Sequence, residues 1–167
     1  SLPGEGYLTE ISDVADVDAI HAAREFARAQ LAEALFEPLW ARYQANRDVS
    51  RRTGYVAEAE HFARRSLQNI VLSYLMLSGK PEVLAATLDQ FDTSDNMTER
   101  LTALAVLVNS PFESERNQAL TDFAETFKDN PLVMDQWFSV QAGCSLPGGL
   151  ERVQALMAHP AFSLKNP

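Results

Sequence analysis

The chain contains little cysteine, no long apolar run and few basic side chains. Cys144 is the only cysteine among 167 residues, which excludes an internal disulfide and a cysteine-rich metal site. A single cysteine also favours a reducing compartment, so we expect a cytoplasmic protein. No apolar run approaches the roughly 20 residues that a membrane-spanning helix needs. The start, Ser1 to Gly4, is neither basic nor apolar, so it does not indicate a signal peptide.

Acidic side chains outnumber basic ones, with 23 Asp and Glu against 14 Lys and Arg, for a net charge of −9. Such a surface repels phosphate backbones and anionic lipids, so we expect neither nucleic acid nor a membrane as a partner. The hydrophobic content of 46% is typical of globular proteins. The length suits one domain with its own core, and we expect residues 1–167 to form a single domain.

Apolar residues recur with helical spacing along most of the chain. Two long helices are predicted, over residues 17–44 and 57–78, and Pro38 predicts a kink or break in the first, near Phe36-Glu37. The apolar stripe of the second consists of Ala63, Leu67, Ile70, Val71, Tyr74 and Leu77. Gly79 is expected to end that helix, because glycine readily adopts the left-handed conformation.

Shorter helices follow, and residues typical of helix starts mark several of them. Asn96, Ser110 and Asn130 each stand where a side chain would cap the first turn, and Pro81 suits a first helical position. No convincing strand is found. Helix starts recur about every 15–19 residues after Pro81, so two helices make a unit the size of an α-solenoid repeat. We therefore expect an all-α fold, a superhelical array of antiparallel helix pairs resembling armadillo repeats, although an ordinary helical bundle fits the spacing almost as well.

No constellation of residues indicates catalysis or metal binding. His21 and Glu25 lie four residues apart on a predicted helix, but a zinc site needs three or four protein ligands. Cys144 has no basic surroundings that would activate a thiolate. We predict no catalytic residue, no metal ligand and no cofactor in this chain.

Two surface features suggest contact with another part of a larger protein. Eight of the 14 basic residues precede residue 66, and Arg47, Arg51 and Arg52 cluster in what is predicted to be a loop between the long helices. A solvated loop explains that cluster, and so does contact of Arg51 and Arg52 with an acidic surface. Trp137 and Phe138 are adjacent, so one of them is a candidate for facing another domain.

Five segments in one order resemble a known family. They read DAIHAAREF (residues 18–26), ARRSLQNIVLSYL (63–75), DNMTERLTAL (95–104), NPLVMDQWFSVQA (130–142) and HPAFSLKNP (159–167). Together they resemble the C-terminal helical domain of the bacterial aminopeptidase N family, the alanyl aminopeptidases of the gluzincin class.

The resemblance implies a non-catalytic role for this chain. Members of the family are zinc metallopeptidases that remove N-terminal residues from peptides, and their zinc motif and substrate-amine motif lie in an earlier domain. Neither motif occurs here. In the family the C-terminal domain closes over the catalytic domain of the same polypeptide, walls off the active-site cavity and limits access to small peptides. None of the family's functional residues can be transferred to a position in this chain.

An alternative is an independent helical-repeat module that binds a protein partner. The chain lacks an initiator Met and stops abruptly at Asn166-Pro167, so we expect a segment of a longer protein that is truncated at its C-terminal end. A free-standing repeat protein usually carries polar capping helices. The peptidase-domain interpretation is therefore preferred.

Overall fold

The structure is a computed structural model that describes residues 2–163, and within that range it contains helices and no strand. The elements are α1 (Glu5–Glu10), α2 (Val17–Ala34), α3 (Phe36–Thr53), α4 (Ala59–Leu75), the short 3-10 helix η1 (Met76–Ser78), α5 (Pro81–Thr93), α6 (Met97–Val108), α7 (Glu113–Phe127), α8 (Pro131–Ala142) and α9 (Gly149–Met157). The predicted all-α class is confirmed. No helix in this range is long and apolar enough to cross a membrane.

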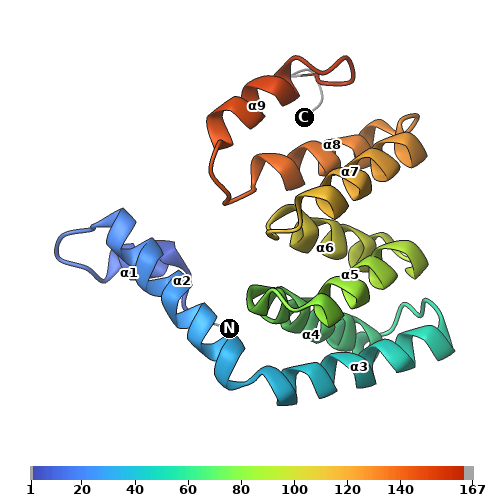
Figure 1. The fold of residues 1–167 in the computed structure, drawn as a ribbon, viewed down its shortest axis with the longest axis horizontal. Coiled ribbons are helices and arrows are strands. Elements are labelled where there is room, and N and C mark those ends of the chain that lie inside the picture. The colour runs from blue at the N-terminus through green and yellow to red at the C-terminus, as the bar shows by residue number, and fades with distance from the viewer. Residues whose placement is uncertain (1, 164–167) are drawn as a thin grey trace.

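Helices α3 to α9 form a stack of successive layers (Figure 1). Neighbouring helices pair as α3 with α4, α5 with α6 and α7 with α8, and α6 also packs against α4, α7 and α8. Helix α9 covers α8 at the end of the stack. The array of helix pairs predicted from the spacing of the helix starts is therefore confirmed.

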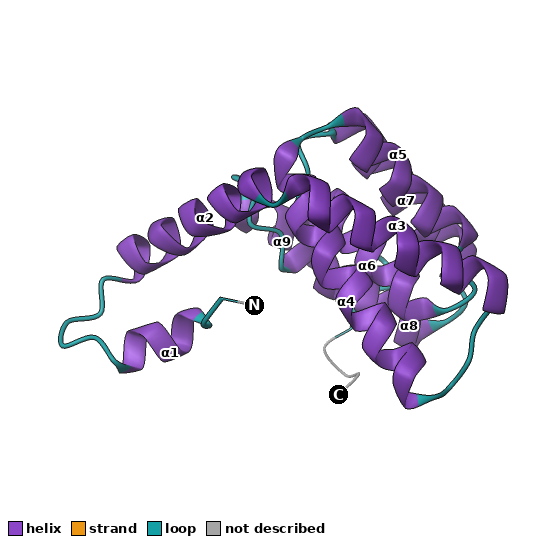
Figure 2. Ribbon diagram, turned by 90° about the horizontal axis from the view of Figure 1, so that it is seen from below, coloured by secondary structure: helices purple, strands orange, loops and turns teal. Residues whose placement is uncertain are grey.

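Helices α1 and α2 form an arm that lies outside the stack (Figures 1 and 2). We use "the arm" for residues 5–34. Helix α1 packs on α2, and α2 reaches the stack through contacts with α3, α4 and η1. Figure 2 shows the outer part of the arm pointing away from the other helices.

The first long helix predicted from the sequence is two helices. The chain changes direction at Leu35, between α2 and α3, one residue before the predicted break. Pro38 is the reason: it lacks a backbone N–H, and its ring would collide with the carbonyl group four residues earlier in a continuous helix. In the first turn of α3 its missing N–H costs nothing, because no partner exists there.

The prediction that the basic residues lie in a loop between the long helices is wrong. Helix α3 extends to Thr53, so Arg47, Arg51 and Arg52 lie on its last turns. Arginines there interact favourably with the partial negative charge of the helix C-terminus. Gly54, with φ of 65°, ends the helix.

Helix α4 turns a different face to the core than its apolar stripe predicts. Leu67, Ile70 and Leu77 of that stripe remain 42–47% exposed, while Arg65 and Gln68 are buried. These two polar side chains find partners inside. The Arg65 guanidinium donates to the Val56 carbonyl oxygen at 3.2 Å, and Gln68 donates to the Gln90 side chain at 2.9 Å. These hydrogen bonds offset part of the cost of burying the two polar side chains, which this orientation of the helix requires.

Two of the three predicted caps stand at helix N-termini. Asn96 accepts a hydrogen bond from the backbone N–H of Glu99 at 3.0 Å, and Asn130 accepts one from Val133 at 3.3 Å. Ser110 is not a cap of α7, which begins only at Glu113. Its hydroxyl instead donates to the Leu107 carbonyl oxygen at 2.7 Å. The intervening turn lets Phe112 pack against the core near α4, and this displaces the start of α7.

Replacing Asn96 by alanine is expected to lower the free energy of unfolding by about 1 kcal/mol, because the Glu99 N–H loses its side-chain acceptor. Urea denaturation followed by circular dichroism measures the change. Asn117→Ala on the exposed surface of α7 is the matched control, with an expected change within about 0.5 kcal/mol. Equal stability of the Asn96→Ala variant and the parent chain would contradict the capping role.

Candidate functional site

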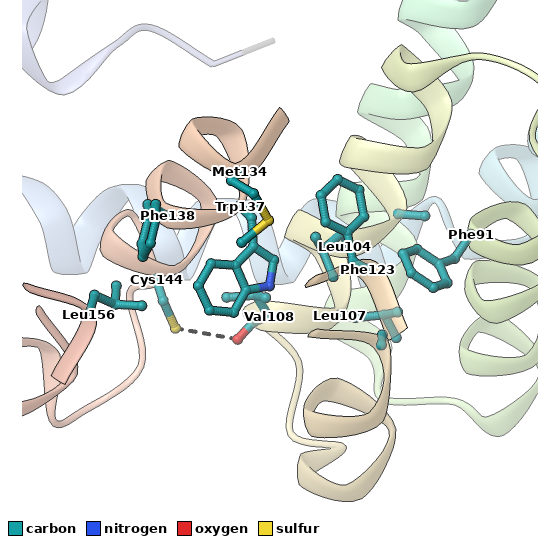
Figure 3. Close-up of a cluster of buried hydrophobic side chains, with 12 residues drawn as sticks. Phe91, Leu104, Leu107, Val108, Phe123, Met134, Trp137, Phe138, Cys144 and Leu156 are labelled. Atoms are coloured by element: carbon teal, nitrogen blue, oxygen red, sulfur yellow. Dashed lines mark hydrogen bonds between the residues drawn. The ribbon is translucent and has the colours of Figure 1, made fainter. Parts of the chain in front are cut away.

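Trp137 and Phe138, of which one was a candidate for facing another domain, are both buried. Both are only 8% exposed and belong to one core cluster, which Figure 3 shows with Val108, Cys144 and Leu156. The Trp137 ring nitrogen donates to the Leu120 carbonyl oxygen at 2.9 Å. The Phe138 ring meets that of Phe162 edge-on, with 5.6 Å between centroids. Both side chains are therefore in the core, and neither offers a docking surface.

Arg51 and Arg52 remain accessible on the last turn of α3. Arg51 is half-exposed and forms an ion pair with Asp89 of α5, so part of its charge is already balanced within the domain. Arg52 is exposed. Contact between this end of α3 and another domain stays a prediction.

Arg47, the third arginine of that group, has a structural position instead. Its guanidinium is buried and lies 3.3 Å from the carboxylate of Glu99, which is also buried. Ser50 and Ser94 donate to the same carboxylate at 3.2 Å and 3.3 Å. The Arg47 guanidinium also donates to Thr93. This network connects α3, α5 and α6, and Arg47 also lines the groove between α3 and α5.

Tyr43 extends the buried network. Its hydroxyl lies 3.1 Å from both the Ala86 carbonyl oxygen and Gln90 Oε1. Burial raises the pKa of the Tyr43 hydroxyl well above its usual range, so the group keeps its proton at neutral pH and acts as a donor. Gln90 in turn donates to the Glu99 backbone carbonyl at 3.0 Å. Tyr43 therefore connects α3 to α5 through its hydroxyl group.

Within residues 2–163 no three His, Cys, Asp or Glu side chains are grouped so that they could hold a metal ion. His21 does not pair with Glu25, as the sequence spacing suggested, but lies 2.9 Å from Glu5 of α1. Cys144 is a free, buried thiol that donates to the Val108 carbonyl oxygen at 3.3 Å (Figure 3). These residues do not fit a zinc site.

A groove of about 600 Å³ lies between the arm and the stack. Its arm side is charged, with Glu5, His21, Arg24, Glu25 and Arg28. Its stack side is mainly apolar, with Met76, Leu77, Ala105 and Val106 among its residues. Ion pairs connect the charged side, including Arg28 to Glu25 at 2.8 Å. A second groove, of about 570 Å³, runs between α3 and α5 beside Arg51 and Asp89.

Comparison with known proteins identifies the family. A family model described as a domain of unknown function, DUF3458_C, with ARM repeats matches residues 1–167. The chain belongs to the DUF3458_C family. The ARM-repeat description agrees with the stack of helix pairs, which is the architecture predicted from the sequence.

Members of this family occur in larger aminopeptidase chains. The chain is 33% identical to aminopeptidase N of Haemophilus influenzae and 32% identical to that of Escherichia coli, each over 167 residues. It is 34% identical over 170 residues to aminopeptidase N of Caulobacter vibrioides. In every case the whole chain is covered, but it spans only 18% to 19% of the relative.

A solved structure agrees with these relatives. The crystal structure of Legionella pneumophila aminopeptidase A in complex with aspartic acid superposes with a TM-score of 0.82 and 27% sequence identity. All of this chain is covered, and 20% of that chain. The resemblance to the C-terminal domain of the aminopeptidase N family is therefore confirmed, and the homologues show such a domain within a longer aminopeptidase chain.

Sequence reasoning missed the groove. Its walls come from α1, α2, α4, η1, α6 and the turn after α8, which are distant in the chain. The basic and acidic residues of α2 at positions 24, 25 and 28 were the only signal, and they read equally well as a solvated helix face.

Proposed function

We propose that this DUF3458_C domain is the non-catalytic C-terminal domain of a zinc-dependent aminopeptidase, which removes N-terminal residues from peptides. The domain packs on the catalytic domain of the same polypeptide, which supplies the zinc, and closes one side of the active-site cavity. Access is thereby limited to small peptides. The enzyme works in the cytoplasm, and the domain itself needs neither membrane nor nucleic acid.

The observation that carries this proposal is similarity over the whole chain to proteins named aminopeptidase N, of which this chain spans less than one fifth. One structural feature supports it. The exposed apolar stripe of α4, with Leu67 and Ile70, is suited to cover by a neighbouring domain.

The groove between the arm and the stack is the part of this domain that we assign to the wall of the cavity. Helical-repeat proteins bind ligands on extended concave surfaces. Its apolar side would contact peptide side chains, whereas its charged side is held by internal ion pairs such as Arg28–Glu25. The groove therefore limits the size of the peptide that can enter and does not select for a particular peptide residue.

Narrowing the groove tests the proposal in the full-length aminopeptidase. Ala105→Trp adds a large ring to the stack side of the groove. It should lower kcat/KM for peptides of about ten residues roughly fivefold and leave kcat/KM for an alanine-linked chromogenic amide nearly unchanged. The comparison of the two substrates separates restricted access from damage to the catalytic site.

Ala85→Trp is the matched control, because Ala85 is exposed on α5 and does not line the groove. This variant should change neither value. The deciding quantity is kcat/KM for the long peptide divided by kcat/KM for the chromogenic amide. If this ratio is the same for Ala105→Trp and Ala85→Trp, the peptide does not pass along the groove.

A further inference from the structure

Exposed large apolar side chains follow one another more closely in the arm than in the stack, where Leu132 and Leu150 are comparably exposed but isolated. Tyr7, Ile11, Val14, Val17 and Phe26 are exposed by 59%, 62%, 86%, 63% and 67% respectively. All five occur within 20 consecutive positions. In the stack, side chains of this size are mostly buried in two core clusters. Scattered exposed apolar residues need no explanation, but a concentration of this kind marks an interaction surface.

The arm gains almost nothing from its own packing. Helix α1 has six residues and buries none of them, and α2 buries only Ala32, near its attachment to the stack. A helix as short as α1 is marginal in water without tertiary contacts. The apolar side chains of the arm are therefore available to stabilise it only if another surface covers them.

Polar contacts hold the outer arm in one shape. Glu5 of α1 lies 2.9 Å from the His21 ring nitrogen, and Arg24 donates to the Pro3 carbonyl oxygen at 3.1 Å. Asp16 caps α2 by accepting from the Ala19 N–H at 2.9 Å. These bonds connect α1 to α2 and orient the exposed apolar residues of the two helices relative to one another.

The negative charge of the arm indicates that the partner surface is basic. The first 23 residues contain Glu5, Glu10, Asp13, Asp16 and Asp18 and not one Lys or Arg. Four of these acids lie in residues 10–18, beside Ile11, Val14 and Val17 at the tip of the arm. A complementary surface has an apolar hollow for these side chains and basic side chains around it.

We propose that the arm docks on the rest of the aminopeptidase polypeptide, in an apolar hollow ringed by basic side chains, and joins the helical domain to its catalytic part. This inference rests on the proposed function. In the relatives about four fifths of the length lies outside the matched segment, which is enough chain to supply a covering surface. A second copy of the arm does not suit the site, because two acidic tips would repel each other.

Cysteine labelling in the full-length protein tests the docking directly. Val14→Cys places a thiol at the most exposed apolar position of the arm. The rate of maleimide labelling at this position is measured by mass spectrometry of the peptide that contains it, in buffer and in denaturant. Docking should slow labelling in buffer at least about tenfold relative to the denatured chain, because a covered thiol reacts only when the arm opens. A rate equal to that of the denatured chain would overturn the proposal.

Two further measurements test the partner and its charge. The labelling rate should not change on dilution across the range in which any dimer dissociates. Protection that disappears with such a dimer would mean that the occupant is a second copy, and would overturn the proposal. Adding Glu10→Lys and Asp13→Lys to the Val14→Cys variant should raise the labelling rate about threefold or more, because the new lysines would repel basic residues of the partner surface. An unchanged rate would contradict the proposal that basic side chains surround the hollow.

Failure of this inference is separate from failure of the proposed function. If Val14→Cys labels freely while Ala105→Trp still discriminates against long peptides, the groove lines the cavity and the arm does not dock. If position 14 is protected but Ala105→Trp has no selective effect, the arm docks and the groove has no part in substrate access.

Discussion

Replacing Arg47 by methionine should destabilise the domain by about 3–5 kcal/mol. Arg47 and Glu99 are both buried, and the guanidinium lies 3.3 Å from the carboxylate. Without its partner, the Glu99 carboxylate stays in the interior with hydroxyl donors from Ser50 and Ser94 but no balancing charge. Hydroxyl hydrogen bonds offset only part of the cost of removing a charge from water. Urea unfolding of the 167-residue chain at pH 7 measures the loss.

A double variant separates loss of the charge pair from loss of shape. Arg47→Met combined with Glu99→Leu removes both charges, so it should be less destabilised than Arg47→Met alone. Arg52→Met, on the exposed side of the same helix, is the control and should change stability by no more than about 0.5 kcal/mol. If Arg47→Met behaved like Arg52→Met, the buried pair would not stabilise the packing of α3 on α6.

Phe123→Ala should cost a similar amount, about 3–5 kcal/mol, through a different mechanism. Phe123 of α7 is buried in the larger core cluster, and its ring centroid lies 4.7 Å from that of Phe127 and 6.4 Å from that of Phe91. Removing the ring leaves a cavity between α5 and α7 that the surrounding helices fill only in part. Helix α7 itself should persist, because alanine has a high helix propensity.

The matched control for Phe123→Ala is Leu132→Ala, which truncates an apolar side chain that is largely exposed on α8. It should change stability by no more than about 0.5 kcal/mol. Phe123→Leu, which refills part of the space, should fall between the two. Thermal melting and urea unfolding give the order of the three variants. A Phe123→Ala variant as stable as Leu132→Ala would show that this cluster is not the core of the stack.

Local signals in the sequence located several helix boundaries correctly. Asn96 begins α6 and Pro81 begins α5, as their residue types indicate. Gly79, with φ of 62°, ends the turn after α4. Such signals succeed because a cap or a proline acts on backbone groups within one turn of itself. The same locality explains why Ser110 failed: Phe112, which packs on a distant helix, determines where α7 begins.

The sequence alone determined the all-α fold class and the resemblance to the aminopeptidase N family. Only the tertiary structure decided which faces are buried. It buried Arg47 with Glu99, 52 positions apart, and covered both Trp137 and Phe138. It also placed the groove between the arm and the stack and left the arm exposed. The physical reason is that burial depends on which distant helix packs against a given face. The spacing of apolar residues within one helix does not identify that partner.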